Sequence, residues 1–140
     1  AVLRKPDRLV LIDPKGNELE PISAKNAEDK LLIEGPGAAR QVEELGKLLD
    51  AAPALKPQIA SAEWVGNRRW NLTFKTGQLL ALPEGELGPP ALVKFAQLDG
   101  MHRLIGGKPV AIDMRVPDRA YLRCEDGPCP KQMSLNGRGQ

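Results

Sequence analysis

The chain has 140 residues, of which 41% are hydrophobic, 27% charged and 4% aromatic. This length suits one domain with its own core, and 14 Gly and 13 Pro predict many short elements. A net charge of +2 is low for a dedicated nucleic-acid-binding module, so we expect no nucleic-acid partner. One His and two Cys are too few for a four-ligand zinc site, and we expect neither a metal nor a cofactor.

The first third of the chain predicts a hairpin and a third strand. Branched apolar residues at 8–12 precede Asp13-Pro-Lys-Gly16, a sequence typical of a turn, and residues 18–22 are the expected returning strand. Residues 31–33 form a short apolar run that ends at Glu34-Gly-Pro-Gly37. We expect that sequence to lead the chain into a helix.

Two amphipathic helices are predicted from apolar residues spaced three and four apart. The first covers residues 38–52 and is ended by Pro53, which cannot continue a helix. The second begins at Pro89 or Pro90, and its apolar stripe is expected to continue past Gly100 to Met101 and Leu104.

The remaining patterns predict strands. Residues 61–65, 69–74 and 78–82 favour a meander, and residues 110–114 and 119–124 favour a final pair joined by a turn at 116–118. Residues 125–140 contain almost no apolar side chains, so we expect a disordered tail. The fold class that follows is α+β, a largely antiparallel β-sheet with two main helices packed against it.

Three sequence features could carry chemistry, and each has an ordinary structural explanation. His102 and Asp99 are one helical turn apart, which would suit a small hydrolase, but we expect a solvated histidine and name no catalytic residue. Cys124 and Cys129 could form a disulfide in an oxidising compartment and would be free thiols in a reducing one. Asn71 begins a glycosylation sequon, as in a secreted binding domain of unrelated lineage.

A partner surface is the remaining candidate site. Arg68 and Arg69 precede Trp70, and we expect at least one of these arginines to face a partner. The last predicted strand, residues 119–124, is followed by a tail without a strand pattern, so we expect its outer edge to be open. An open edge can receive an extended segment of another chain, and Arg119 and Arg123 would attract an acidic one.

Several segments resemble the FtsQ/DivIB family of bacterial cell-division proteins. Residues 65–77, Val-Gly-Asn-Arg-Arg-Trp-Asn-Leu-Thr-Phe-Lys-Thr-Gly, are similar to a family segment of the form RRW-x-L-x-(L/F)-K-x-G. Residues 110–119, Val-Ala-Ile-Asp-Met-Arg-Val-Pro-Asp-Arg, resemble its near-terminal segment. The resemblance covers about residues 8 to 124 in the family's order.

The resemblance implies a domain organisation and a location. Family members have a cytoplasmic tail, one membrane helix, a small POTRA domain and a β domain in the periplasm. We therefore expect residues 1–7 to be a remnant of a preceding POTRA-like segment, 8–124 the β domain and 125–140 the tail. The parent protein would be a single-pass inner-membrane protein at the division septum.

The resemblance also implies a function and a set of site residues. The family is non-enzymatic and binds FtsB, paired with FtsL, along the last strand of the β domain, which helps couple septal wall synthesis to division. By position, the partner-binding residues here are Arg68 or Arg69 and one continuous segment. That segment comprises Val116, Pro117, Asp118, Arg119, Ala120, Tyr121, Leu122, Arg123 and Cys124.

Overall fold

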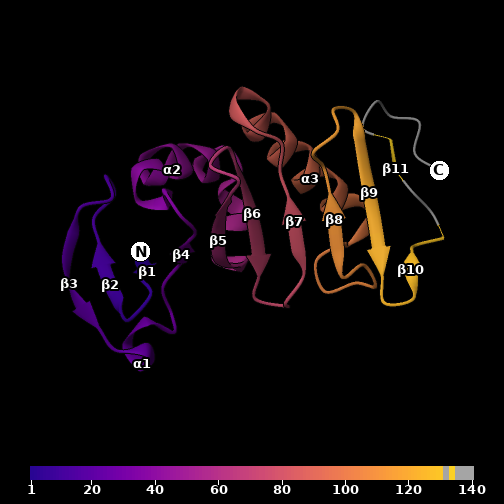
Figure 1. Ribbon diagram of the computed structural model, residues 1–140. Coiled ribbons are helices and arrows are strands. Elements are labelled where there is room, and N and C mark those ends of the chain that lie inside the picture. Colours follow the sequence, from indigo (N-terminus) through magenta and orange to yellow (C-terminus); the bar gives the residue numbers. More distant parts are fainter. Residues whose placement is uncertain (131–132, 135–140) are drawn as a thin grey trace.

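The computed structural model describes residues 1–130 and 133–134, and these residues form one large mixed sheet with helices on one side (Figure 1). The sheet order is β10-β9-β8-β7-β6-β5-β4-β1-β2-β3, and β11 pairs with β9. The strands are β1 (Val2–Arg4), β2 (Leu9–Ile12), β3 (Glu18–Ile22), β4 (Leu32–Glu34), β5 (Ile59–Val65), β6 (Arg69–Phe74), β7 (Leu79–Ala81), β8 (Ala111–Asp113), β9 (Arg119–Cys124), β10 (Gly127–Pro128) and β11 (Met133–Ser134).

The predicted α+β class is confirmed. Most neighbouring strands run antiparallel, including the β2–β3 hairpin and the β5–β6–β7 meander. Three pairs are parallel, β1 with β4, β4 with β5 and β7 with β8. The β4–β5 and β7–β8 pairs are each joined by a connection that contains a main helix, as parallel neighbours require.

The helical segments lie mainly in those two connections. They are α1 (Ala24–Ala27), η1 (Ala38–Gln41), α2 (Val42–Asp50), η2 (Pro53–Gln58), η3 (Gly85–Leu87) and α3 (Gly88–His102). The sequence did not predict α1, which falls in a polar stretch and buries none of its residues. None of the described helices is long and apolar enough to cross a membrane.

The second main helix is shorter than its apolar stripe predicted. The α3 helix ends at His102 because Arg103 adopts a left-handed conformation with φ 53° and its amide caps the Asp99 carbonyl. Met101 lies within the helix and is 69% exposed. Leu104 lies in the loop after the helix and is buried. The stripe therefore mixed one exposed residue with one core residue of the following loop.

The core lies between the sheet and the helices α2 and α3. Along β6, Trp70, Leu72 and Phe74 point into this core, as the alternating pattern predicted. Phe74 stacks on Phe95 of α3 with ring centroids 5.5 Å apart. Because side chains alternate, the intervening residues of β6 must point to the other face of the sheet, which carries neither α2 nor α3 (Figure 1).

Gly35 lets β4 approach the meander closely. Its φ of 109° is accessible to glycine but strained for other residues, and a Cβ atom there would overlap the Trp64 carbonyl oxygen of β5. The chain then enters η1 and α2, as the Glu34-Gly-Pro-Gly37 sequence predicted.

The N-terminal boundary expected from the sequence was wrong. Residues 2–4 form β1, which pairs with β2 and β4 inside the sheet. Val2 is fully buried and Leu3 belongs to the core cluster. Residues 1–7 are therefore not a separate remnant, because β1 completes the sheet between β2 and β4.

The expected disorder after residue 124 was also wrong for the described part of the tail. Residues 127–128 form β10 and residues 133–134 form β11, both antiparallel to β9. Backbone pairing and a disulfide hold this segment without the apolar pattern that we took as the signal for a strand. The other tail residues from 131 onward lie outside the described part of the chain.

Candidate functional site: the uncovered face of β6 to β9

The candidate site is the sheet face opposite α2 and α3, where outward side chains form a row across four strands. Asn71 of β6 lies opposite Ala81 of β7, Ala81 lies opposite Asp113 of β8, and Asp113 lies opposite Tyr121 of β9. Residues opposite one another in a sheet are near enough for their side chains to interact. The row therefore joins the Arg-Arg-Trp segment to the last long strand.

A hollow of about 580 Å³ lies over this row. Its lining residues come from β6 to β10 and the loop after β8, and they include three arginines and one aspartate. The charged and polar members are Arg69, Asn71, Asp113, Arg115, Tyr121 and Arg123. The excess of positive charge makes the hollow suited to an acidic segment.

The two arginines at the centre of the hollow have different partners. Arg69 donates from Nη1 to the Asn71 side-chain oxygen at 2.7 Å, a neutral acceptor. Arg115 bonds both carboxylate oxygens of Asp113, from Nε at 2.9 Å and from Nη2 at 2.7 Å. The Arg115 charge is thus offset by a direct ion pair, whereas Arg69 forms no ion pair among the described residues and feels the charges of Asp113 and Glu63 only at longer range.

The electrostatics of these groups follow from those contacts. Partial burial, reinforced by the positive charge of Arg115, lowers the pKa of Arg69, and the guanidinium stays charged in the physiological range. The side-chain hydrogen bond from Arg115 is the main cause that lowers the pKa of Asp113, against the opposing effect of burial. Asp113 therefore stays ionised at neutral pH and holds Arg115 against the sheet.

The structure distinguishes the two arginines that the sequence left open. Arg69 is half-buried and lines the hollow together with residues of β9. Arg68 is exposed and lines a second hollow of about 450 Å³, formed with α2 and the start of α3, which Arg69 also lines. Only Arg69 of this pair is brought next to the candidate residues of β9.

The candidate segment 116–124 is divided between the sheet face, the core and a turn. Tyr121 is 46% exposed, and it shares the uncovered face with the exposed Arg119 and Arg123. Ala120 and Leu122 instead point into the core, so their side chains are not accessible to a partner. Val116, Pro117 and Asp118 form the turn before β9 and lie against the start of α3.

The expectation of an open outer edge on β9 was wrong. The Arg123 carbonyl accepts from the Val110 amide at 2.7 Å on the β8 side, so the backbone groups of Ala120, Leu122 and Cys124 face outward. Gly127 of β10 lies opposite Cys124, and Met133 of β11 lies opposite Ala120. The chain's own tail therefore occupies this edge.

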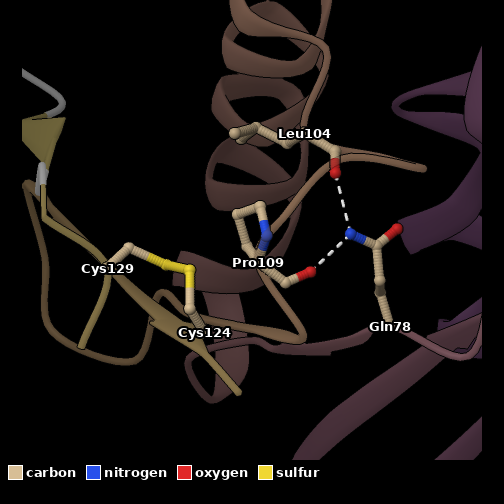
Figure 2. The surroundings of a disulfide bond; sticks show 5 residues. All are labelled: Gln78, Leu104, Pro109, Cys124 and Cys129. Carbon is tan, nitrogen blue, oxygen red and sulfur yellow. Dashed lines mark hydrogen bonds between the residues drawn. A yellow bond between two sulfur atoms is a disulfide. The ribbon is translucent and has the colours of Figure 1, made fainter. Parts of the chain in front are cut away.

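A disulfide joins Cys124 to Cys129, and of the two states that the sequence left open, disulfide or free thiols, the structure has the disulfide (Figure 2).

Gln78, which precedes β7, is a buried polar side chain near this disulfide (Figure 2). Its amide nitrogen donates to the carbonyl oxygens of Leu104 at 2.8 Å and Pro109 at 2.6 Å. Gln78 thereby ties the connection between α3 and β8 to the meander.

Sequence reasoning missed Asp113, Arg115 and Gln78. Asp113 could have been found, because it occupies an outward position in the predicted strand 110–114. Gln78 gave no such signal, because nothing in a single sequence indicates that a glutamine is buried among backbone carbonyls.

The structure shows no catalytic arrangement of Asp99 with His102 among the described residues. Asp99 accepts the Ile105 amide at 2.7 Å and so completes the end of α3, while His102 is exposed at the last helical position. Asn71 accepts from Arg69 on the sheet face. No group of three or more His, Cys, Asp or Glu able to hold a metal ion occurs in the described part of the chain.

The fold and this surface define an α+β domain whose distinctive chemistry is an arginine-lined sheet face. Residues 1–115 match the family model of the C-terminal part of the cell-division protein FtsQ/DivIB. The chain is 64% identical over 124 residues to the cell division protein FtsQ of Novosphingobium aromaticivorans, covering 88% of this chain and 39% of that protein. It is 43% identical over 117 residues to FtsQ of Zymomonas mobilis, covering 84% of this chain and 37% of the relative.

The chain belongs to the FtsQ/DivIB family of bacterial cell-division proteins. It spans about two fifths of the length of these curated relatives. The predicted family is therefore confirmed.

Proposed function

We propose that this chain is the part of a non-catalytic divisome scaffold that binds FtsB, paired with FtsL, on the periplasmic side of the inner membrane at the septum. The parent protein would be anchored there through a segment outside this chain. The observation that carries the proposal is the arginine-lined hollow, which is continuous with the outward side chains of β9.

The partner's extended segment would lie across the face and along β9. An acidic side chain of that segment would meet Arg69, whose guanidinium donates a hydrogen bond to the neutral side-chain amide of Asn71. Tyr121 would supply exposed aromatic surface beside it. Charge pairing and aromatic contact of this kind are typical of residues that dominate a binding interface.

Strand addition along β9 fits this arrangement only if part of the tail leaves the edge. With β10 and β11 in place, backbone hydrogen bonds to a partner strand are blocked at their positions. Contacts to the sheet face need no such change, because the side chains of Arg69 on β6 and Tyr121 on β9 line the hollow on that face, away from the backbone edge of β9.

The proposal predicts that Tyr121→Lys weakens binding of an FtsB–FtsL complex from the same bacterium about tenfold, as expected for the loss of one aromatic contact. The domain should stay folded, since Tyr121 is 46% exposed. Isothermal titration calorimetry would measure the affinity, and circular dichroism the fold.

Leu19→Lys is the matched control. Leu19 is 58% exposed and lies on β3, at the opposite end of the sheet. We expect the Leu19→Lys variant to bind the FtsB–FtsL complex with the affinity of the unchanged chain. Equal affinities for the Tyr121 and Leu19 variants would contradict the assignment of the β9 face as the partner surface.

A further inference from the structure

The tail meets every outward-facing backbone position of β9 along its length. Gly127 lies opposite Cys124, the Cys129 amide donates to the Leu122 carbonyl at 3.0 Å, and Met133 lies opposite Ala120. Backbone pairing of this kind is what a strand added from another chain would make. A partner strand and the tail therefore require the same groups.

The disulfide separates β10 from β11, and only β11 can leave the edge of β9 while the disulfide is intact. Cys129 is bonded to Cys124 at the end of β9, with their Cα atoms 5.1 Å apart. The segment from 125 to 129, which includes β10, is therefore closed onto β9 at both ends. The two residues of β11 lie beyond this loop and pair with β9.

We infer that β11 is an internal competitor for the partner strand, and that the Cys124–Cys129 disulfide limits the competition to the first half of β9. When β11 leaves, the outward backbone groups of Ala120 become available, while those of Leu122 and Cys124 stay covered by Cys129 and β10. This inference rests on the proposed function, because it concerns the same edge.

The position of the exchangeable half supports this inference. Ala120 lies next to Tyr121 and to the turn at 116–118, where Val116 is 48% exposed. A partner strand that replaces β11 would thus lie beside the exposed aromatic and apolar side chains of the proposed surface. The fixed half lies at the other end of β9, beside the disulfide.

Two truncations of the 140-residue chain test the competition. A chain ending at Pro130 lacks β11 but keeps both cysteines, and a chain ending at Ser134 keeps β11 as the matched control. If β11 covers the edge about nine tenths of the time, its removal raises the affinity for the FtsB–FtsL complex about tenfold. The chain ending at Ser134 should bind as the full chain does.

Amide hydrogen exchange of the free chains tests the division of the edge without any partner. Removal of β11 should speed exchange at Ala120 about tenfold and leave Cys124 unchanged. The double variant Cys124→Ser, Cys129→Ser should speed exchange of the amide at position 124 even in the 140-residue chain.

The outcomes separate this inference from the proposed function. Measurable but equal affinity for the two truncated chains would overturn the competition and leave the proposed function intact. No binding by any chain would overturn the proposed function, and the exchange data would then judge the edge alone. Equal exchange at Ala120 in the two truncated chains would overturn the inference in either case.

Discussion

Arg69→Glu should weaken binding of the FtsB–FtsL complex about 100-fold, equivalent to about 2.7 kcal/mol. The substitution replaces a guanidinium of the hollow that forms no direct ion pair with Asp113 by a carboxylate that repels an acidic partner. Raising the salt concentration should weaken binding to the unchanged chain for the same reason. Titration calorimetry at two salt concentrations would measure both effects.

Arg68→Glu is the matched control, because it makes the same charge change one residue away. Arg68 is exposed and lines the hollow formed with α2 instead of the hollow over β9. We expect an affinity within about threefold of the unchanged chain. An equal loss in both variants would mean that net charge, and not the position of Arg69, governs binding.

Gln78→Ala should lower the free energy of unfolding by about 3 kcal/mol. The substitution leaves the buried carbonyls of Leu104 and Pro109 without their donor and the Gly106 amide without the acceptor that it contacts at 2.7 Å. The affected connection leads directly into β8, so we also expect faster amide exchange in that strand. Urea denaturation would give the stability change.

Gln58→Ala provides the comparison for Gln78. The Gln58 side chain donates an exposed hydrogen bond to the Ala54 carbonyl at 3.4 Å, and the loss of this bond should cost less than about 0.5 kcal/mol. Similar stability losses for the two variants would show that burial of the Gln78 network is not what makes it stabilising.

Local patterns predicted the elements well where a strand or helix has one buried face. The alternation of Trp70, Leu72 and Phe74 gave the exact bounds of β6, and the final strand 119–124 was likewise found in full. The first main helix was predicted because four of its residues are buried at helical spacing. In these elements burial and local periodicity indicate the same structure.

The errors arose where distant segments decide the structure. β1 is only three residues long, and its place between β2 and β4 depends on a parallel partner about 30 residues away in sequence. β10 and β11 carry little apolar pattern, because backbone pairing with β9 and the disulfide hold them. For this reason the prediction that the outer edge of β9 is open was wrong.

The candidate site was predicted in part. The sequence drew attention to the Arg-Arg-Trp segment and to residues 116–124, and the structure shows that Arg69, Tyr121 and Arg123 line one hollow. The sequence alone could not show whether Arg68 or Arg69 faces the partner, because that depends on which of the two lines the hollow together with residues of β9. It also included Leu122, whose side chain is 5% exposed, so substitutions there would test stability more than binding.

Site-specific photo-crosslinking in growing cells tests the central claim, that the β9 face is the partner surface, most directly. A photoreactive phenylalanine would replace Tyr121 in the full-length protein, and the same residue at Leu19 would serve as the reference on β3. We expect irradiation to join the position-121 variant, and not the position-19 variant, to FtsB or FtsL. Crosslinking of these partners from position 19 and not from position 121 would contradict the claim.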